Sequence, residues 1–111
     1  MSDPESVVGE QFSAYAKRDV EAFISTYAPD AVVLRFAEGN ILAKGHDELR
    51  RVYGKFFANN PGLKCALQSR FVKGDIVVDH ELLSGLTGKK DSSSVVIYEV
   101  KDGLIARARL I

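Results

Sequence analysis

The stretch Lys73–Leu86 constrains the fold most, because it is long enough to cross a whole domain as a single strand. Successive side chains of a β-strand point to opposite faces of the sheet. One face therefore holds Ile76, Val78, His80, Leu82 and Ser84, and the other holds Val77, Asp79, Glu81 and Leu83. His80 is thereby the one titratable group on an otherwise apolar face. What that face packs against is the central functional question.

Length and charge narrow the class of protein. At 111 residues the chain predicts one domain, residues 1–111, with one hydrophobic core. Lys plus Arg equal Asp plus Glu at 15 each, so no excess positive charge attracts nucleic acid or anionic lipid. The chain shows neither the pattern of a signal peptide nor an apolar run of membrane-spanning length. We therefore expect no nucleic-acid or membrane partner and a cytoplasmic location.

Apolar spacing and breakers predict three helices in the first half of the chain. Asp3 and Pro4 suit the start of the first helix, as cap and first helical residue. The second helix begins at Asp19, and Pro29 ends it because proline cannot continue the hydrogen-bond ladder. The third follows Gly45 and stops at Asn59-Asn60-Pro61-Gly62. A short hairpin of residues 31–36 and 41–44 separates the second helix from the third.

The second half of the chain changes to long strands joined by tight turns. The predicted strands are Leu63–Val72, Ile76–Leu86, Ser93–Lys101 and Leu104–Ile111. Turns such as Lys73-Gly74-Asp75 and Asp102-Gly103 favour consecutive antiparallel hairpins. The order predicts an α+β domain in which helices cover one face of a curved, mostly antiparallel sheet.

Both faces of the later strands carry apolar residues, although the helices can cover only one face. The predicted outer face holds Val77, Leu83, Val95, Ile97, Ile105 and Ile111. Such a face is too apolar to leave in water, so we expect a second subunit to cover it and form a homodimer. Arg107 and Arg109 share this face by alternation, with Asp79, Glu81 and Glu99 as candidate partners across strands.

With this element order, the chain resembles the nuclear transport factor 2-like superfamily, which includes SnoaL-like polyketide cyclases and ketosteroid isomerases. The resemblance covers nearly the whole chain. It is carried by Phe12–Tyr15, Asp19–Tyr27, Tyr27–Val33, Gly45–Tyr53 and Val96–Leu110. It implies a cone-like barrel of cystatin-like α+β type, whose curved sheet wraps the first helix and leaves a mostly apolar pocket. These motifs specify a fold better than a reaction.

The catalytic positions that the resemblance implies are not filled by the usual residues. The hydrogen-bonding tyrosine of ketosteroid isomerases falls near Gln11, their general-base aspartate on Arg35, and their second acid on Val96. Isomerisation by that mechanism needs a carboxylate base and an oxyanion donor. The sequence therefore argues against a true ketosteroid isomerase, and of the Asp-Arg-Asp set of the epoxide-hydrolase branch only an arginine matches.

His80 is the first candidate for an acid or base. The resemblance implies that the face it shares with Leu82 lines the pocket, where a neutral imidazole can exchange a proton near pH 7. The alternative is a histidine bonded within the core or placed at a wet edge. A one-residue bulge would swap the faces and bring Asp79 into the pocket instead.

Arg35 and the tyrosines are the remaining site candidates. Arg35 faces inward by the family alignment, where it can stabilise negative charge, but simple alternation favours a solvated arginine. Tyrosine rings with single hydroxyls suit the wall of a pocket for a flat apolar ligand, and we expect about two of the four to touch it. The predicted ligand-binding residues are Tyr53, Tyr98, Tyr15, Gln11, Val96 and Leu82.

No metal or cofactor is predicted. Cys65 is the only cysteine, and His46 and His80 lack a third convergent ligand. The leading hypothesis is a domain that binds a small apolar organic molecule and, if catalytic, performs proton transfer of an isomerase or cyclase, with His80 as acid or base and Arg35 or a tyrosine hydroxyl stabilising charge. The alternative is a non-catalytic, dimeric binding or assembly module.

Overall fold

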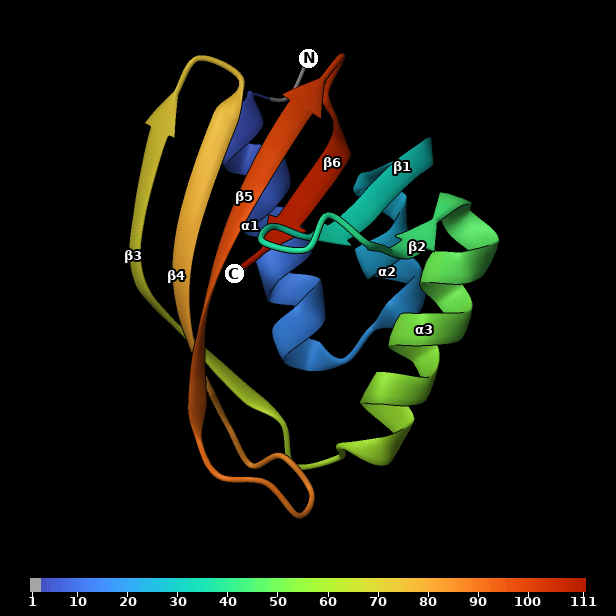
Figure 1. Ribbon diagram of the computed structural model, residues 1–111, viewed down its shortest axis with the longest axis vertical. Coiled ribbons are helices and arrows are strands. Elements are labelled where there is room, and N and C mark those ends of the chain that lie inside the picture. The colour runs from blue at the N-terminus through green and yellow to red at the C-terminus, as the bar shows by residue number, and fades with distance from the viewer. Residues whose placement is uncertain (1–2) are drawn as a thin grey trace.

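The chain forms three helices and six strands, here described from a computed structural model for residues 3–111 (Figure 1). The elements in chain order are α1 (Pro4–Lys17), α2 (Val20–Ser25), β1 (Tyr27–Arg35), β2 (Ile41–Lys44), α3 (Gly45–Asn59), β3 (Lys64–Lys73), β4 (Ile76–Ser84), β5 (Ser92–Lys101) and β6 (Leu104–Leu110). The predicted α+β class and the curved sheet are confirmed.

All six strands belong to one sheet in the order β2-β1-β6-β5-β4-β3. The pairing is antiparallel except between β1 and β6, which run parallel. The predicted hairpin and the four-strand meander are therefore both present, joined by that parallel pair. The sheet is strongly curved but unclosed, with β2 and β3 at its edges.

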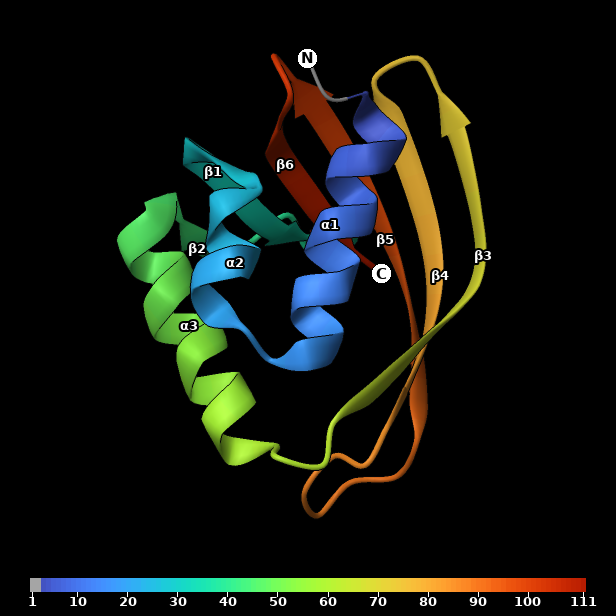
Figure 2. The ribbon, with the colours of Figure 1, turned by 180° about the vertical axis from the view of Figure 1, so that it is seen from behind.

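The helices lie on the concave face of the sheet (Figure 2). Helix α1 crosses β3 to β6, whereas α3 packs against β1 and β2. Asp3 caps α1 by accepting a 2.8 Å hydrogen bond from the Ser6 amide, and Asp19 caps α2 in the same way. Among residues 3–111, no helix combines the length and apolar character that crossing a bilayer requires.

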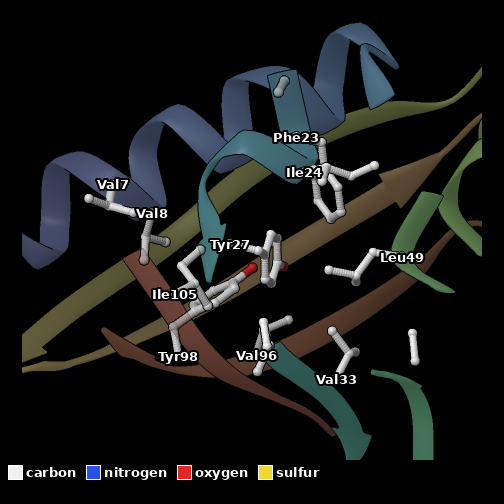
Figure 3. Close-up of a cluster of buried hydrophobic side chains, with 14 of the residues drawn as sticks. Val7, Val8, Phe23, Ile24, Tyr27, Val33, Leu49, Val96, Tyr98 and Ile105 are labelled. Atoms are coloured by element: carbon white, nitrogen blue, oxygen red, sulfur yellow. The ribbon is translucent and has the colours of Figure 1, made fainter. Parts of the chain in front are cut away.

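Residues from all three helices meet the sheet in one buried core (Figure 3). Phe23 and Ile24 of α2 and Leu49 of α3 are almost fully buried there. Tyr27 and Tyr98 belong to the same cluster. Two tyrosines at the centre of an apolar core bring hydroxyl groups to a place where polar groups need partners.

One predicted boundary is wrong at the end of the second helix. Helix α2 ends at Ser25, and Pro29 lies inside β1 instead of terminating a helix. Proline is tolerated there because the register between β1 and β6 shifts between Tyr27 and Val32, so its missing N–H interrupts no regular ladder.

The predicted outer face is correct for half of its apolar residues. Val95, Ile97 and Ile111 lie on the convex face, as predicted. Val77 and Ile105 are fully buried on the concave face instead, and Leu83 also faces inward. Ile105 changes face because the register between β5 and β6 shifts between Glu99 and Val100, which places Ile105 opposite the buried Val100. Arg107 and Arg109 both pair with Glu99 on the convex face, and neither pairs with Asp79 or Glu81.

Candidate functional site

A small cavity lies between the helices and the concave face of the sheet. Its volume is about 140 Å³. Helices α1 and α3 contribute side chains from one side, and strands β1, β4, β5 and β6 from the other. The lining residues are Gln11, Tyr15, Tyr27, Tyr53, Glu81, Leu83, Ser94, Val96, Tyr98 and Leu110. The cavity is thus walled mainly by tyrosine rings and aliphatic side chains.

Five of the six predicted ligand-binding residues line this cavity. They are Tyr53, Tyr98, Tyr15, Gln11 and Val96. Tyr27 lines it as well, so all four tyrosines reach a space that we expected about two to touch. Leu82 does not, because its side chain points to the convex face and is 41% exposed. The structure brings these residues together, and their role in binding a ligand stays a prediction.

His80 lies on the convex face of the sheet, away from the cavity. It is half-buried and sits opposite Ser69 of β3 and Val95 of β5. The predicted orientation of β4 is therefore wrong, although its alternation is regular. The register with β5 runs without interruption from Ile76 to Leu83, and the shift in the pairing with β3 lies in β3, between Leu67 and Ser69. The faces of β4 are therefore reversed without a bulge in β4 itself. Both faces of β4 carry aliphatic residues, and the more apolar face is the one turned away from the helices.

Arg35 is the last residue of β1. Strand alternation places it on the concave side, but its position at the strand end leaves it in solvent. It shares the concave side with Val33 and pairs in register with Leu110, which lines the cavity. The residue is nevertheless exposed and does not line the cavity, because the strand ends there. The family alignment was therefore correct about the face of β1 on which Arg35 lies. The alternative prediction, a solvated arginine, was correct about its exposure.

Among residues 3–111, Glu81 is the one carboxylate that lines the cavity. Only 6% of the residue is exposed. Burial, and to a smaller extent the neighbouring Asp79, raise the pKa of Glu81 from 4.5 to about 7, although Arg70 and Tyr98 act to lower it. A carboxyl group in this state exists in both protonated and ionised forms near neutral pH, which is what proton transfer requires.

Asp79 is also fully buried on the concave face, but it is ion-paired. The Nε and Nη2 atoms of Arg70 donate to its two carboxylate oxygens at 2.6 and 2.8 Å. Strand pairing places Arg70 directly opposite Asp79, so the fork can reach both oxygens. The inward-facing Arg70 is therefore engaged by Asp79, and Glu81 has no hydrogen-bonded cation of its own among the ion pairs of residues 3–111.

A hydrogen-bond chain links two tyrosines across the cavity through Gln11. The Tyr98 hydroxyl donates to the amide oxygen of Gln11 at 3.2 Å, and the amide nitrogen of Gln11 donates to the Tyr27 hydroxyl oxygen at 3.2 Å. Burial raises the pKa of both Tyr27 and Tyr98 well above the usual value, so both remain protonated donors. Because Gln11 occupies Tyr27 as an acceptor, the Tyr27 hydrogen itself can be directed to a ligand.

The surroundings of His46 and Cys65 indicate structural roles for these two side chains. The Nε2 atom of His46 lies 2.8 Å from the Tyr27 carbonyl oxygen, at the start of α3. Burial raises the pKa of the Cys65 thiol to about 12, which keeps it protonated and unreactive. Within residues 3–111, no group of three or more His, Cys, Asp or Glu side chains is placed to hold a metal ion.

Glu81 is the residue that sequence reasoning missed. The sequence places it beside Asp79 on one face of β4, and that face looked like a charged surface because two acids share it. The available signal was Arg70, which the turn at Lys73-Gly74-Asp75 places opposite Asp79. Because one arginine pairs with Asp79, the other acid on this face, Glu81, is left without an arginine opposite it.

The family model for a SnoaL-like domain matches residues 8–108 of this chain. No curated protein matches the sequence. Solved structures with the same fold include a cystatin-fold protein from Novosphingobium aromaticivorans, with a TM-score of 0.91 and 18% identity over 100% of this chain and 99% of that one.

Two further solved structures with this fold carry names that refer to an activity. A protein from Sinorhizobium meliloti assigned to the polyketide cyclases has a TM-score of 0.82 and 24% identity, covering 96% of this chain and 94% of that one. A protein from Kribbella flavida assigned to the ketosteroid isomerases has a TM-score of 0.82 and 19% identity, covering 96% and 75%. At these identities the likeness shows a shared fold.

The raised pKa of Glu81 predicts a stability that falls with rising pH. Between pH 4.5 and about 7 the folded chain keeps a proton on Glu81 that the unfolded chain has lost. The free energy of unfolding should therefore fall through this window, by about 3 kcal/mol in total. In Glu81→Gln this loss should disappear, so the stability of the variant relative to the wild type should be higher at pH 8 than at pH 4.

Urea unfolding at pH 4, 6 and 8 measures this difference. The exposed Glu38 provides the control, because Glu38→Gln removes a carboxylate without changing a buried one. The account is contradicted if Glu81→Gln and Glu38→Gln show the same pH dependence.

Proposed function

Because the chain belongs to the SnoaL-like domain family, we propose that it binds a small organic molecule in the cavity and catalyses proton transfer of the isomerase or cyclase kind. Glu81 removes a proton from carbon next to a carbonyl group and returns it at another position. A tyrosine hydroxyl stabilises the negative charge that develops on the carbonyl oxygen. The observation that carries this proposal is the position of Glu81, a buried carboxyl group on the wall of a mostly apolar cavity.

The pKa of Glu81 suits the role of general base. A base works best when its pKa lies near the operating pH, because it is then both available and able to release the proton again. The value of about 7 follows from burial and from Asp79. Arg70 does not abolish it, because its guanidinium group is bound by Asp79 at 2.6 Å.

The hydrogen-bond chain suits the role of oxyanion stabilisation. Gln11 holds Tyr27 through its amide nitrogen and Tyr98 through its amide oxygen, so both hydroxyl groups keep a defined position. Donors held in place before the reaction stabilise developing charge without reorganising. Tyr27 has its hydrogen available, which makes it the proposed donor to the ligand oxygen.

This assignment replaces His80 and Arg35 as the predicted catalytic pair. Neither lines the cavity. The resemblance placed the general base at the position of Arg35, at the end of β1. The base proposed here, Glu81, lies on β4 instead. The proposed chemistry therefore uses a carboxylate and a tyrosine, as isomerisation requires, in a different arrangement along the chain.

Exchange of α-hydrogens with deuterium in a small cyclic ketone tests the proposal without knowledge of the natural substrate. The wild type should accelerate exchange, with a rate that rises through about pH 7 as Glu81 ionises. Glu81→Gln should lose about 100-fold or more of that acceleration, the usual contribution of a general base. His80→Leu is the matched control on the same strand and should stay within a few-fold of the wild type. Exchange that survives in Glu81→Gln, or fails in His80→Leu, would contradict the assignment.

A second candidate function is a non-catalytic, dimeric binding or assembly module, favoured by the apolar convex face. Ile76, Val78 and Ile97 are only half-buried there, and Ile111 is 62% exposed. We propose that a second copy of the chain covers this face. Sedimentation should show a species of twice 12.2 kDa at micromolar concentration, and Ile97→Lys should shift it to the monomer. A wild type that sediments only as a monomer would contradict the dimer.

A further inference from the structure

We propose that the ligand of the cavity is an uncharged carbonyl compound whose buried part is no larger than a single six-membered ring. This inference rests on the proposed function and names the class of substrate for the same site. It follows from the size of the cavity, from the stiffness of its walls and from the charges that face it.

The size of the cavity sets the first limit. A volume of about 140 Å³ is small for a ligand site. An apolar cavity of about 150 Å³ holds benzene, whereas drug-sized ligands occupy about 300–1,000 Å³. A single ring with its carbonyl oxygen fits this space. Fused ring systems, such as steroids and aromatic polyketides, do not.

Aromatic packing keeps the walls from moving aside. Tyr15 contacts four other rings, including Phe56, which is stacked on it at 6.1 Å, and Phe57 at 5.4 Å. Tyr53 packs against Phe23 with ring centroids 4.6 Å apart. Each tyrosine on the helical side is thus backed by further rings, and closely packed interiors resist expansion.

The opposite walls are also held in place. Tyr27 and Tyr98 are tied to each other through Gln11. Tyr98 stands next to Val96 on the same face of β5, and both are buried within the sheet. Widening the cavity on this side would break two buried hydrogen bonds, each of which leaves a polar group without its partner. The size limit therefore applies to the walls formed by the four tyrosines and Val96.

The charges around the cavity set the second limit. Within the part of the chain that the structure describes, Glu81 is the one carboxylate on the wall, and no lysine or arginine lines the cavity. Of the cations near it, Arg70 is bound by Asp79, and Arg35 is exposed at the end of β1. A buried carboxylate or phosphate without a counter-charge is strongly unfavourable. Keto acids and phosphorylated compounds are therefore excluded, and a neutral ketone or enone remains.

The polar groups on the wall match such a ligand. The Tyr15 and Tyr53 hydroxyls add to that of Tyr27, whereas the Tyr98 hydrogen is held by Gln11. Burial raises the pKa of Tyr53 to about 12, so its hydroxyl donates a hydrogen bond and does not ionise near neutral pH. A neutral carbonyl oxygen accepts such bonds without carrying a charge into the cavity. The proposed ligand is thus a single ring whose carbonyl oxygen lies near the tyrosine hydroxyls and whose acidic carbon lies near Glu81.

Binding of a matched set of compounds tests both limits at pH 8. Cyclohex-2-enone and benzamide are single-ring neutral compounds, benzoate is the charged isostere of benzamide, and a two-ring enone and a steroid enone extend the size series. Calorimetry should detect the two neutral single-ring compounds, with benzoate and the larger enones at least tenfold weaker. Benzoate as tight as benzamide, a larger enone as tight as cyclohexenone, or no binding of either single-ring compound would each overturn the proposal.

Variants in neighbouring positions of β5 locate the effect. Val96→Ala enlarges the cavity, and Val95→Ala makes the same change on the convex face. The affinity ratio of two-ring to single-ring enone should rise about tenfold in Val96→Ala and stay unchanged in Val95→Ala. Equal ratios in the two variants would show that the compounds bind elsewhere and would overturn the proposal.

The variant Glu81→Gln separates this inference from the proposed function. If single-ring neutral compounds bind both wild type and Glu81→Gln but neither protein exchanges their α-hydrogens, the ligand class stands and the catalytic proposal fails. If Glu81-dependent exchange occurs faster on a steroid enone or a keto acid than on cyclohexenone, the catalytic proposal stands and the ligand class fails.

Discussion

The ion pair between Arg70 and Asp79 is the interaction on which the site depends. Asp79 is fully buried, and only an arginine fork bonded to both of its oxygens makes that placement tolerable. Removing one member of such a pair typically costs about 3–5 kcal/mol, because the other charge is left buried alone. The pair also joins the edge strand β3 to β4 under α1. With Arg70 engaged in this way, Glu81 remains without a bonded cation and titrates near neutrality.

Curvature of the sheet turns this local arrangement into a cavity. Strands β3 to β6 bend around α1, so the inward faces of β4 and β5 line one cavity together with side chains of α1 and α3. The tyrosines fill most of that space and leave about 140 Å³. A carboxyl group on this wall loses water without gaining a countercharge, and this is the physical origin of its raised pKa. The curvature of the sheet thus buries Glu81, and this burial raises its pKa.

Much of the fold was predictable because its signals are local. Capping at Asp3 and Asp19, the apolar stripe of α3 and the turns between the long strands each act over a few residues. The orientation of β4 was not, because Ile76, Val78 and Leu82 make the convex face at least as apolar as the concave one. Alternation states which residues share a face, and only the packing of helices decides which face is inside. That decision placed Glu81, and not His80, at the cavity.

Titration of the Glu81 carboxyl carbon by NMR, with the signal assigned by its loss in Glu81→Gln, tests the central claim most directly. The account predicts a midpoint near pH 7 for the folded protein, well above the ordinary 4.5 of a glutamate. A midpoint at or below 4.5 would show that Glu81 is solvated or paired. In that case the cavity would have no acid or base poised for proton transfer.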